Sequence, residues 1–231
     1  MVEKTEHLVR SELRTPRAAA IAGILFAVLY STSWILIRLS IPGNALEASD
    51  WLQQQAGNLS LAMTLIPFAG ISFLWFMGVV RDRLGRQEDQ FFSTLFFGSG
   101  YLYLGLTFVS AAAIGGALVL FASDPDLLAT SGVYSLALVL SNRLNSVYAM
   151  RMAGAFMTAL GTIWVRTGVM PRWLALLTYL LAAVLLISVG FTPWVVLVFP
   201  AWVLTISVVI LVLNYRRTDE RKGPDGLSIA S

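Results

Sequence analysis

The chain has 231 residues, of which 57% are hydrophobic and 13% charged, and its formal net charge is +3. Soluble domains carry about 25% charged residues, so this chain has too little charge to cover a water-exposed surface. We therefore expect lipid to be the solvent for much of it, in agreement with its mean hydropathy of +0.75. The chain has no cysteine and one histidine, which excludes disulfides, cysteine metal sites and bis-histidine haem ligation.

The apolar residues gather in runs of about the length, roughly 20 residues, that crosses the hydrocarbon of a bilayer. We expect six such spans, at about 18–40, 59–80, 91–121, 144–165, 173–189 and 194–215. A backbone in lipid must satisfy its own hydrogen bonds, and the runs lack the alternation of barrel strands. The predicted fold class is an all-α polytopic membrane protein, with six transmembrane helices in one bundle at 17–215. A cytoplasmic N-terminal segment at 1–16 and a disordered cytoplasmic tail at 216–231 complete the prediction.

Basic residues mark the cytoplasmic side of a membrane protein. Thirteen of the 16 lie in the N-terminal segment, in the connections after spans two and four, and in the tail. The connections after spans one and five contain none. This alternation predicts an even number of spans with both termini in the cytoplasm.

Several local features predict how individual spans begin or bend. Pro16 fits the start of the first span, because its missing N–H costs nothing there. The apolar segment Val133–Leu140 either lies at the outer surface or forms the first turns of a long fourth span. Pro67 and Pro200 fall inside spans two and six, where each is expected to kink its helix.

Small residues recur along one face of the third span, at Gly98, Gly105, Ala112 and Gly116, with Tyr101 beside them. Small side chains let helix backbones approach closely, which drives packing in lipid. We expect this face to form a tight helix–helix seam. The alternative is that the glycines leave room for a ligand.

The fourth span carries a polar stripe at Arg151, Ala155, Thr158 and Thr162, which recur at steps of four, three and four. These residues share one helix face, with Tyr148 just above them. The stripe is too polar and too small to face lipid well, so we expect it to face the bundle, with Ala155 as a packing residue.

Arg151 has two readings. It lies seven residues into the span, roughly 10 Å below the outer end at 1.5 Å per residue. In the structural reading its long side chain snorkels to headgroup phosphates or to an outer-loop carboxylate. In the functional reading it joins Arg143 and Arg38, with Tyr148 and Thr158, in an outward-facing pocket. A guanidinium there would bind phosphate or carboxylate through paired hydrogen bonds.

No predicted span contains a carboxylate, a histidine or a lysine. Proton relays, paired-aspartate proteolysis, zinc hydrolysis and retinal attachment each need one of those groups inside the membrane. We therefore expect no catalytic residue, no metal and no cofactor. The expected partners are membrane lipids, with a protein partner or a homo-oligomer left open, and no nucleic acid.

The segment Gly161–Ala182, GTIWVRTGVMPRWLALLTYLLA, has a short basic turn followed by Pro-Arg-Trp-Leu at the start of the fifth span. It resembles a group of uncharacterised six-span bacterial integral membrane proteins. The first span is loosely similar as well. The resemblance implies a multi-pass protein of the bacterial cytoplasmic (inner) membrane, and it brings no activity or site residues.

These observations favour a non-catalytic small integral membrane protein that acts as an accessory, lipid-contacting or partner-binding subunit. One alternative is a transporter or binder of an anionic or amphipathic small molecule through the Arg151 pocket. The other is an enzyme that modifies lipids at the outer face, using an acid among Glu47, Asp50, Asp124 and Asp126.

Overall fold

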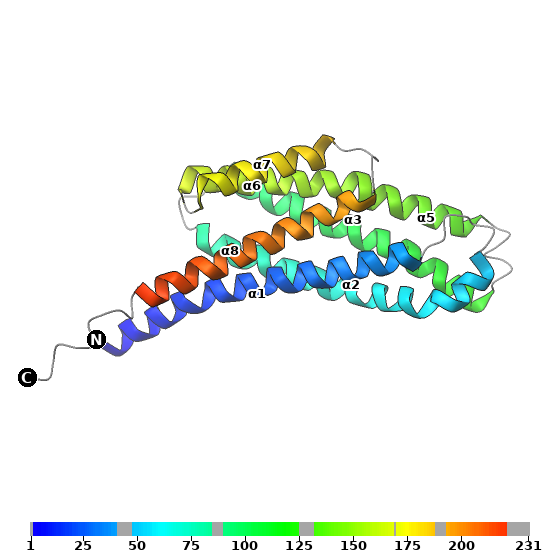
Figure 1. Cartoon of the computed structure of the whole chain (residues 1–231), viewed down its shortest axis with the longest axis horizontal. Helices are drawn as coiled ribbons and strands as arrows, with labels where there is room; N and C mark the ends of the chain where they lie inside the picture. Colours follow the sequence, from blue (N-terminus) through cyan, green and yellow to red (C-terminus); the bar gives the residue numbers. More distant parts are fainter. Residues whose placement is uncertain are drawn as a thin grey trace, which may run out of the picture.

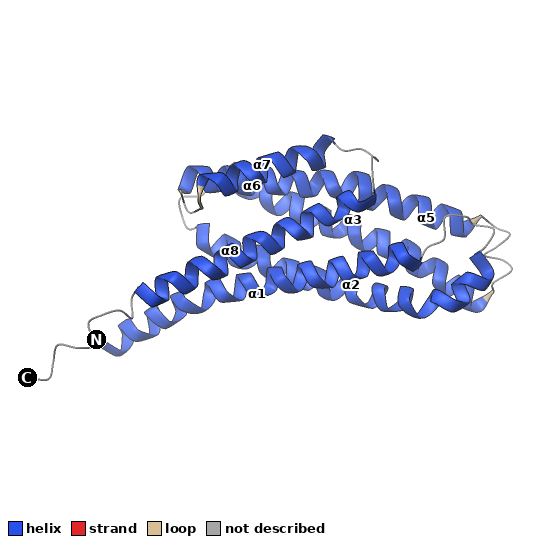
Figure 2. Ribbon diagram, viewed as in Figure 1, coloured by secondary structure: helices blue, strands red, loops and turns tan. Residues whose placement is uncertain are grey.

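A computed structural model describes residues 2–40, 48–84, 90–124, 132–168, 170–187 and 193–220. Side chains are placed within 18–40, 55–81, 90–120, 122–124, 132–168, 170–187 and 194–212. Every regular element in these ranges is a helix, and none is a strand (Figure 2). The all-α prediction is thereby confirmed for the described residues.

The helices follow one another as up-and-down rods (Figure 1). Their bounds are α1 Val2–Ser40, α2 Ala48–Leu84, α3 Gln90–Ser123, α5 Val133–Arg143, α6 Met150–Thr167, α7 Arg172–Ile187 and α8 Val198–Glu220. A π-helix, η3 (Leu144–Ala149), joins α5 to α6 without a break, and a 3-10 helix, η4 (Pro193–Leu197), leads into α8. Because successive rods reverse direction, α1 begins and α8 ends at the same end of the bundle (Figure 1).

Four helices are long and apolar enough to cross a membrane: Ala18–Ser40, Gln55–Arg81, Gln90–Leu120 and Trp194–Val212. The apolar helix Arg172–Ile187 is shorter. The rod α5–η3–α6 is long, but it carries Arg143, Arg151 and Arg166, whose charges lower its hydropathy. The length and composition of these four helices therefore indicate a membrane protein.

An aromatic cluster holds five of the rods together. Phe26 of α1 contacts Phe73 of α2, with ring centroids 4.8 Å apart. Phe73 contacts Phe156 of α6 at 5.3 Å, and Tyr103 of α3 contacts Phe199 of α8 at 4.7 Å. All five side chains are buried. Pairs of this kind contribute about 0.5–1.5 kcal/mol beyond their buried area, so the cluster fixes the centre of the bundle.

One close approach of two helices through small residues lies between α6 and α7. A Cβ added at Gly154 would lie 2.9 Å from Leu186 Cγ and 3.2 Å from the Ala182 carbonyl, both on α7. Gly161 would place its Cβ 3.3 Å from Thr178 Cγ2. The backbones of α6 and α7 therefore approach closely because these two positions have no side chain.

The small residues of α3 were expected to pack against another helix, but at these positions no other helix of the described chain lies close. Gly98, Gly105, Ala112 and Gly116 are all exposed on the outer face of the bundle. A Cβ added at any of these three glycines would meet nothing within 4 Å among the described residues. The face of α3 that enters the core carries Tyr103, Thr107 and larger apolar residues instead, because these side chains fill the space between helices. Ala155 on α6 is half-buried.

The ends of the rods also differ from the prediction. Helix α1 begins at Val2, so Pro16 lies inside it rather than at its start. Helix α8 extends to Glu220, so residues 216–220 are helical rather than part of a disordered tail. Backbone hydrogen bonds continue a helix beyond the apolar run that crosses the membrane. Residues 221–231 lie outside the described residues.

The backbone places two prolines and decides one alternative. Pro67 lies inside α2, which continues through it, and the kink expected there stays a prediction. Pro200 falls in the first turn of α8, just after the 3-10 helix, where a missing N–H is tolerated. The segment Val133–Leu140 forms the first turns of the long fourth rod rather than a separate surface helix.

Candidate functional site

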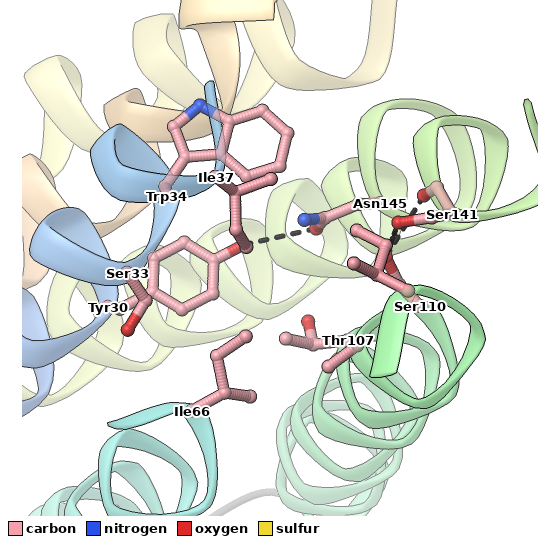
Figure 3. Close-up of a pocket in the computed structure, with 11 residues that line it drawn as sticks. Tyr30, Ser33, Trp34, Ile37, Ile66, Thr107, Ser110, Ser141 and Asn145 are labelled. Atoms are coloured by element: carbon pink, nitrogen blue, oxygen red, sulfur yellow. Dashed lines mark hydrogen bonds between the residues drawn. The ribbon is translucent and has the colours of Figure 1, made fainter. Parts of the chain in front are cut away.

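A small polar cavity lies between α1, α2, α3 and the α5–η3 junction (Figure 3). It leaves about 10 Å³ for the centre of a water molecule, which is room for roughly one water. Its walls are Tyr30, Ser33, Trp34, Ile37, Ile66, Thr107, Ser110, Ala111, Ile114, Ser141 and Asn145. Tyr30 lies ten residues before the end of α1, so the cavity reaches about 15 Å into the bundle from that end.

Hydrogen bonds join three rods around the cavity. The Tyr30 hydroxyl of α1 donates to Asn145 Oδ1 of η3 at 3.1 Å. The Ser110 hydroxyl of α3 lies 3.0 Å from the Ser141 carbonyl oxygen, to which it donates, and 2.7 Å from the Ser141 hydroxyl of α5. All four residues are buried. These bonds tie α1 and α3 to the same short stretch of the fourth rod.

Three polar atoms beside these bonds have no hydrogen-bond partner within the described part of the chain: Trp34 Nε1, Tyr103 OH and Thr107 Oγ1. Their side chains are 6%, 0% and 3% exposed. A buried hydroxyl without a partner costs on the order of 1–3 kcal/mol by protein mutational measurements. The cavity is therefore bordered by hydrogen-bonding capacity that the protein itself does not use.

The π-helix places one side of this site. Residues Leu144–Ala149 make a wider turn than an α-helix, and Asn145 lies within it, buried and facing Tyr30. Single π-turns inside α-helices are rare and occur frequently at functional sites. Here the turn brings Asn145 and Ser141 to the same cavity, although α6 continues in its own phase toward α7.

All the residues that line the cavity are uncharged. At neutral pH such a set donates and accepts hydrogen bonds but supplies no carboxylate, imidazole or ammonium group. Among the described residues, no group of three or more His, Cys, Asp or Glu side chains could hold a metal ion. The lining thus offers hydrogen bonds to a neutral polar group and no counter-charge to an ion.

The sequence-predicted ligand residues lie elsewhere. Arg38, Arg143 and Tyr148 are exposed, and none of them lines the cavity. Arg151 is half-buried, and its Nη1 is 3.5 Å from the Val147 carbonyl one turn earlier. Thr158 is half-buried too, and its hydroxyl donates to the Gly154 carbonyl at 2.9 Å.

Of that stripe on α6, Thr162 does face a neighbouring helix. Its hydroxyl lies 2.8 Å from the Tyr179 hydroxyl of α7. The stripe thus borders α7 rather than a pocket shared by the three arginines. Arg38, Arg143 and Arg151 do not line the cavity between α1, α2, α3 and the α5–η3 junction, and the anionic-ligand hypothesis stays a prediction.

Sequence reasoning missed the cavity residues. The available signal was their spacing: Thr107, Ser110 and Ile114 recur at steps of three and four on one face of α3. Tyr30, Ser33 and Ile37 recur at the same steps on α1. Asn145 is an amide inside a membrane rod, which is costly unless paired. Attention to uncharged polar residues, in addition to the arginines, would have located this face.

Comparisons with protein-family models, with curated proteins and with solved structures found no match for this chain.

Proposed function

We propose that the chain is a six-span protein of the bacterial cytoplasmic membrane with both termini in the cytoplasm. The alternating rods support this topology, since α1 begins and α8 ends at one end of the bundle (Figure 1). Basic side chains lie at that end, where the Arg81 guanidinium is 5.2 Å from the centre of the Phe97 ring. The Arg166 guanidinium lies 4.7 Å from the Phe92 ring. The positive-inside rule assigns such an end to the cytoplasm, and the family resemblance favours a bacterial membrane.

Within that membrane the protein serves as a non-catalytic accessory subunit that contacts lipid and binds a protein partner through the outer face of α3. The observation that carries this proposal is the open groove on that face. Gly98, Gly105 and Gly116 are exposed, and an added Cβ at each meets nothing within 4 Å. Glycine in a membrane helix exposes backbone that packs best against another helix.

The length and period of the groove favour a transmembrane helix as its occupant. Gly98 and Gly116 are 18 residues apart, which is about 27 Å along the helix axis and close to the hydrocarbon thickness of about 30 Å. Gly98, Gly105 and Ala112 recur every seven residues. Tyr101 and Phe108 recur with the same period between them; Tyr101 is 55% exposed, whereas Phe108 is 39% exposed and its ring also packs over Gly70 of α2. A seven-residue repeat of holes and large side chains is the pattern that meshes with a second helix at a shallow left-handed crossing.

The partner is therefore expected to be another protein with an apolar helix that spans the membrane and large side chains facing the glycines. Gly105→Leu places a side chain on this face. Because no described atom lies within 4 Å of a Cβ built at Gly105, the fold should tolerate the change. Gly78→Leu is the matched control, since Gly78 is an exposed glycine of α2 whose added Cβ also meets nothing.

The test is native mass spectrometry of the protein released from its own membrane, as wild type and as each glycine variant. The proposal expects a partner protein bound to wild type and to Gly78→Leu but lost from Gly105→Leu. If the lost mass is a second copy of this chain, the α3 face forms a homo-oligomer, and the proposal of a separate partner protein is wrong. Loss in both variants, or lipid alone in all three samples, contradicts the accessory role.

A further inference from the structure

We propose that the cavity between α1, α3 and η3 binds one neutral hydroxyl group of water size, either a water molecule or the hydroxyl of a membrane-dissolved alcohol or lipid. This site faces the inside of the bundle, opposite the α3 groove, and does not depend on the proposed partner. Its principal ligand is Thr107, with Tyr30 and Asn145 in the same cavity wall. Tyr103 does not line the cavity but lies next to Tyr30 and Thr107.

Thr107 departs from the behaviour of most other threonines. Of the eight others with described side chains, seven donate to the carbonyl four residues earlier, which satisfies the hydroxyl within the helix: Thr64, Thr94, Thr158, Thr162, Thr167, Thr178 and Thr205. The eighth, Thr32, is exposed. Thr107 is buried, and it makes neither this bond nor another well-aligned hydrogen bond to a described residue. Figure 3 shows its hydroxyl oxygen directed toward the side on which the Tyr30–Asn145 bond lies.

Such a rotamer needs a compensating partner. The local bond to the carbonyl four residues back is available to any helical threonine and removes the cost of burying the hydroxyl. The Thr107 side chain is 3% exposed, so its hydroxyl cannot bond to solvent. Without the bond to the carbonyl four residues earlier, the buried hydroxyl lacks compensation for its desolvation. A bound hydroxyl group in the cavity supplies what the rotamer otherwise lacks.

The neighbouring groups complete the coordination of such a ligand. The hydroxyls of Tyr30, Tyr103 and Thr107 lie close enough to interact with one another, and the Tyr30 hydroxyl donates to Asn145. Neither the Tyr103 nor the Thr107 hydroxyl makes a well-aligned hydrogen bond to another described residue. A water or alcohol hydroxyl both accepts and donates, so one molecule can engage two hydroxyls at once. A buried water needs two to four polar partners and about this volume.

The absence of charge in the walls sets the chemical class. An ionic ligand would be desolvated without a counter-charge among the lining residues, which is strongly unfavourable in the bundle. Ile37, Ile66 and Ile114 form the apolar part of the wall, and the volume admits the hydroxyl of an alcohol or lipid but not its chain. The ligand is thus neutral, whether it comes from water or from the membrane.

Thermal unfolding of the purified protein in nanodiscs tests the site, because the two readings predict opposite signs. With a bound hydroxyl, Thr107→Val removes a partner and lowers Tm by about 2–4 °C, while Thr107→Ser retains it. With nothing bound, Thr107→Val removes an unsatisfied buried hydroxyl and leaves Tm unchanged or higher. Ser207→Ala is the matched control, since Ser207 is buried and unpartnered in the described chain but does not line the cavity.

The control fixes the interpretation, and a second measurement identifies the ligand. A Tm loss in Ser207→Ala equal to that in Thr107→Val would overturn the proposal, because the loss would not depend on the cavity. An infrared O–H stretching band that shifts in H₂¹⁸O and disappears in Thr107→Val identifies water. A retained small molecule in native mass spectra, lost in the same variant, identifies a membrane-derived hydroxyl. If wild type shows neither signal, the proposal is wrong, even where Thr107→Val does not fold.

Discussion

The hydrogen bond between Tyr30 and Asn145 gives the sharpest energetic prediction, because it links residues 115 positions apart inside the bundle. Tyr30→Phe removes the donor and leaves the ring in place. Asn145→Leu removes the acceptor at similar volume. We expect each single variant to destabilise the protein, since each strands the other partner, and the double variant to cost less than the sum of the two.

The size of the coupling free energy between Tyr30 and Asn145 depends on how deeply both are buried and on what the unfolded helices contact in lipid. Tyr30 is 3% and Asn145 5% exposed, so a stranded partner in water-soluble proteins would cost about 1–3 kcal/mol. In membrane proteins the unfolded helices still find partners in lipid, and measured couplings average about 0.6 kcal/mol with a maximum near 1.7. A second pair, Ser110 and Ser141, is hydrogen-bonded separately beside the same cavity. We therefore expect a coupling of about 1 kcal/mol.

The assay is a double-mutant cycle by reversible unfolding in mixed micelles. Tyr148→Phe is the matched control, because the Tyr148 side chain is 56% exposed and the change should shift stability by less than about 0.5 kcal/mol. Distant sites add within about 0.3–0.5 kcal/mol. A coupling of zero within that error would show that the bond does not hold α1 to η3, and the reasoning about the cavity network would fail with it.

Gly154→Leu should destabilise the protein by about 1–3 kcal/mol or more, because α7 must move to admit the side chain, whereas Gly105→Leu should leave its unfolding midpoint nearly unchanged. Thr178→Val should cost about 1 kcal/mol by chemical unfolding, since Trp202 Nε1 donates to the Thr178 hydroxyl at 2.9 Å; a loss of similar size in a Trp202→Phe background would contradict this bond. Arg151→Gln should change folding stability by less than about 1 kcal/mol and leave bound phospholipid in native mass spectra unaltered, because the side chain only approaches a carbonyl of its own helix. Loss of a specific lipid would restore the ligand reading of that arginine.

The membrane class and the helical rods follow from the sequence because they depend on composition and run length. Hydrocarbon requires long apolar segments with internally satisfied backbones, and that requirement is visible residue by residue. The sequence does not decide whether Val133–Leu140 lies at the surface or begins a long fourth rod. The segment alone is too short to cross the membrane, and its continuation depends on the polar stretch Ser141–Arg143 remaining helical.

The faces of the rods were harder to predict, and α3 shows why. In water an apolar stripe marks the inside of a bundle, but lipid is as apolar as the core, so that contrast is lost. Small residues at Gly98 and Gly105 and hydroxyls at Thr107 and Ser110 both fit an interior face. The structure buries the hydroxyls, whose polar atoms cost most in lipid, and exposes the glycines.

The same difficulty applies to Arg151. A charge in an apolar run suggests a binding site because its desolvation is costly, yet a long side chain near a helix end can avoid that cost by reaching the interface. Tyr30 and Asn145 cannot reach water from their depth, so they require each other. The uncharged pair therefore carries more information about the interior than the arginine does.

The π-helix at Leu144–Ala149 makes the length of the fourth rod a determinant of its geometry. Removing one residue there would let an ordinary α-helix run through, and the segments before and after would keep their faces, so Ser141 would still lie against Ser110. If all the residues present formed an α-helix instead, everything before the π-turn would turn by about 100° relative to α6. Ser141 would then rotate away from Ser110, although no side chain had changed. The π-turn therefore keeps both halves of the rod on their own faces. A π-turn is also the form in which a helix absorbs an inserted residue, so this part of the site has the signature of an insertion that the fold accommodated rather than expelled.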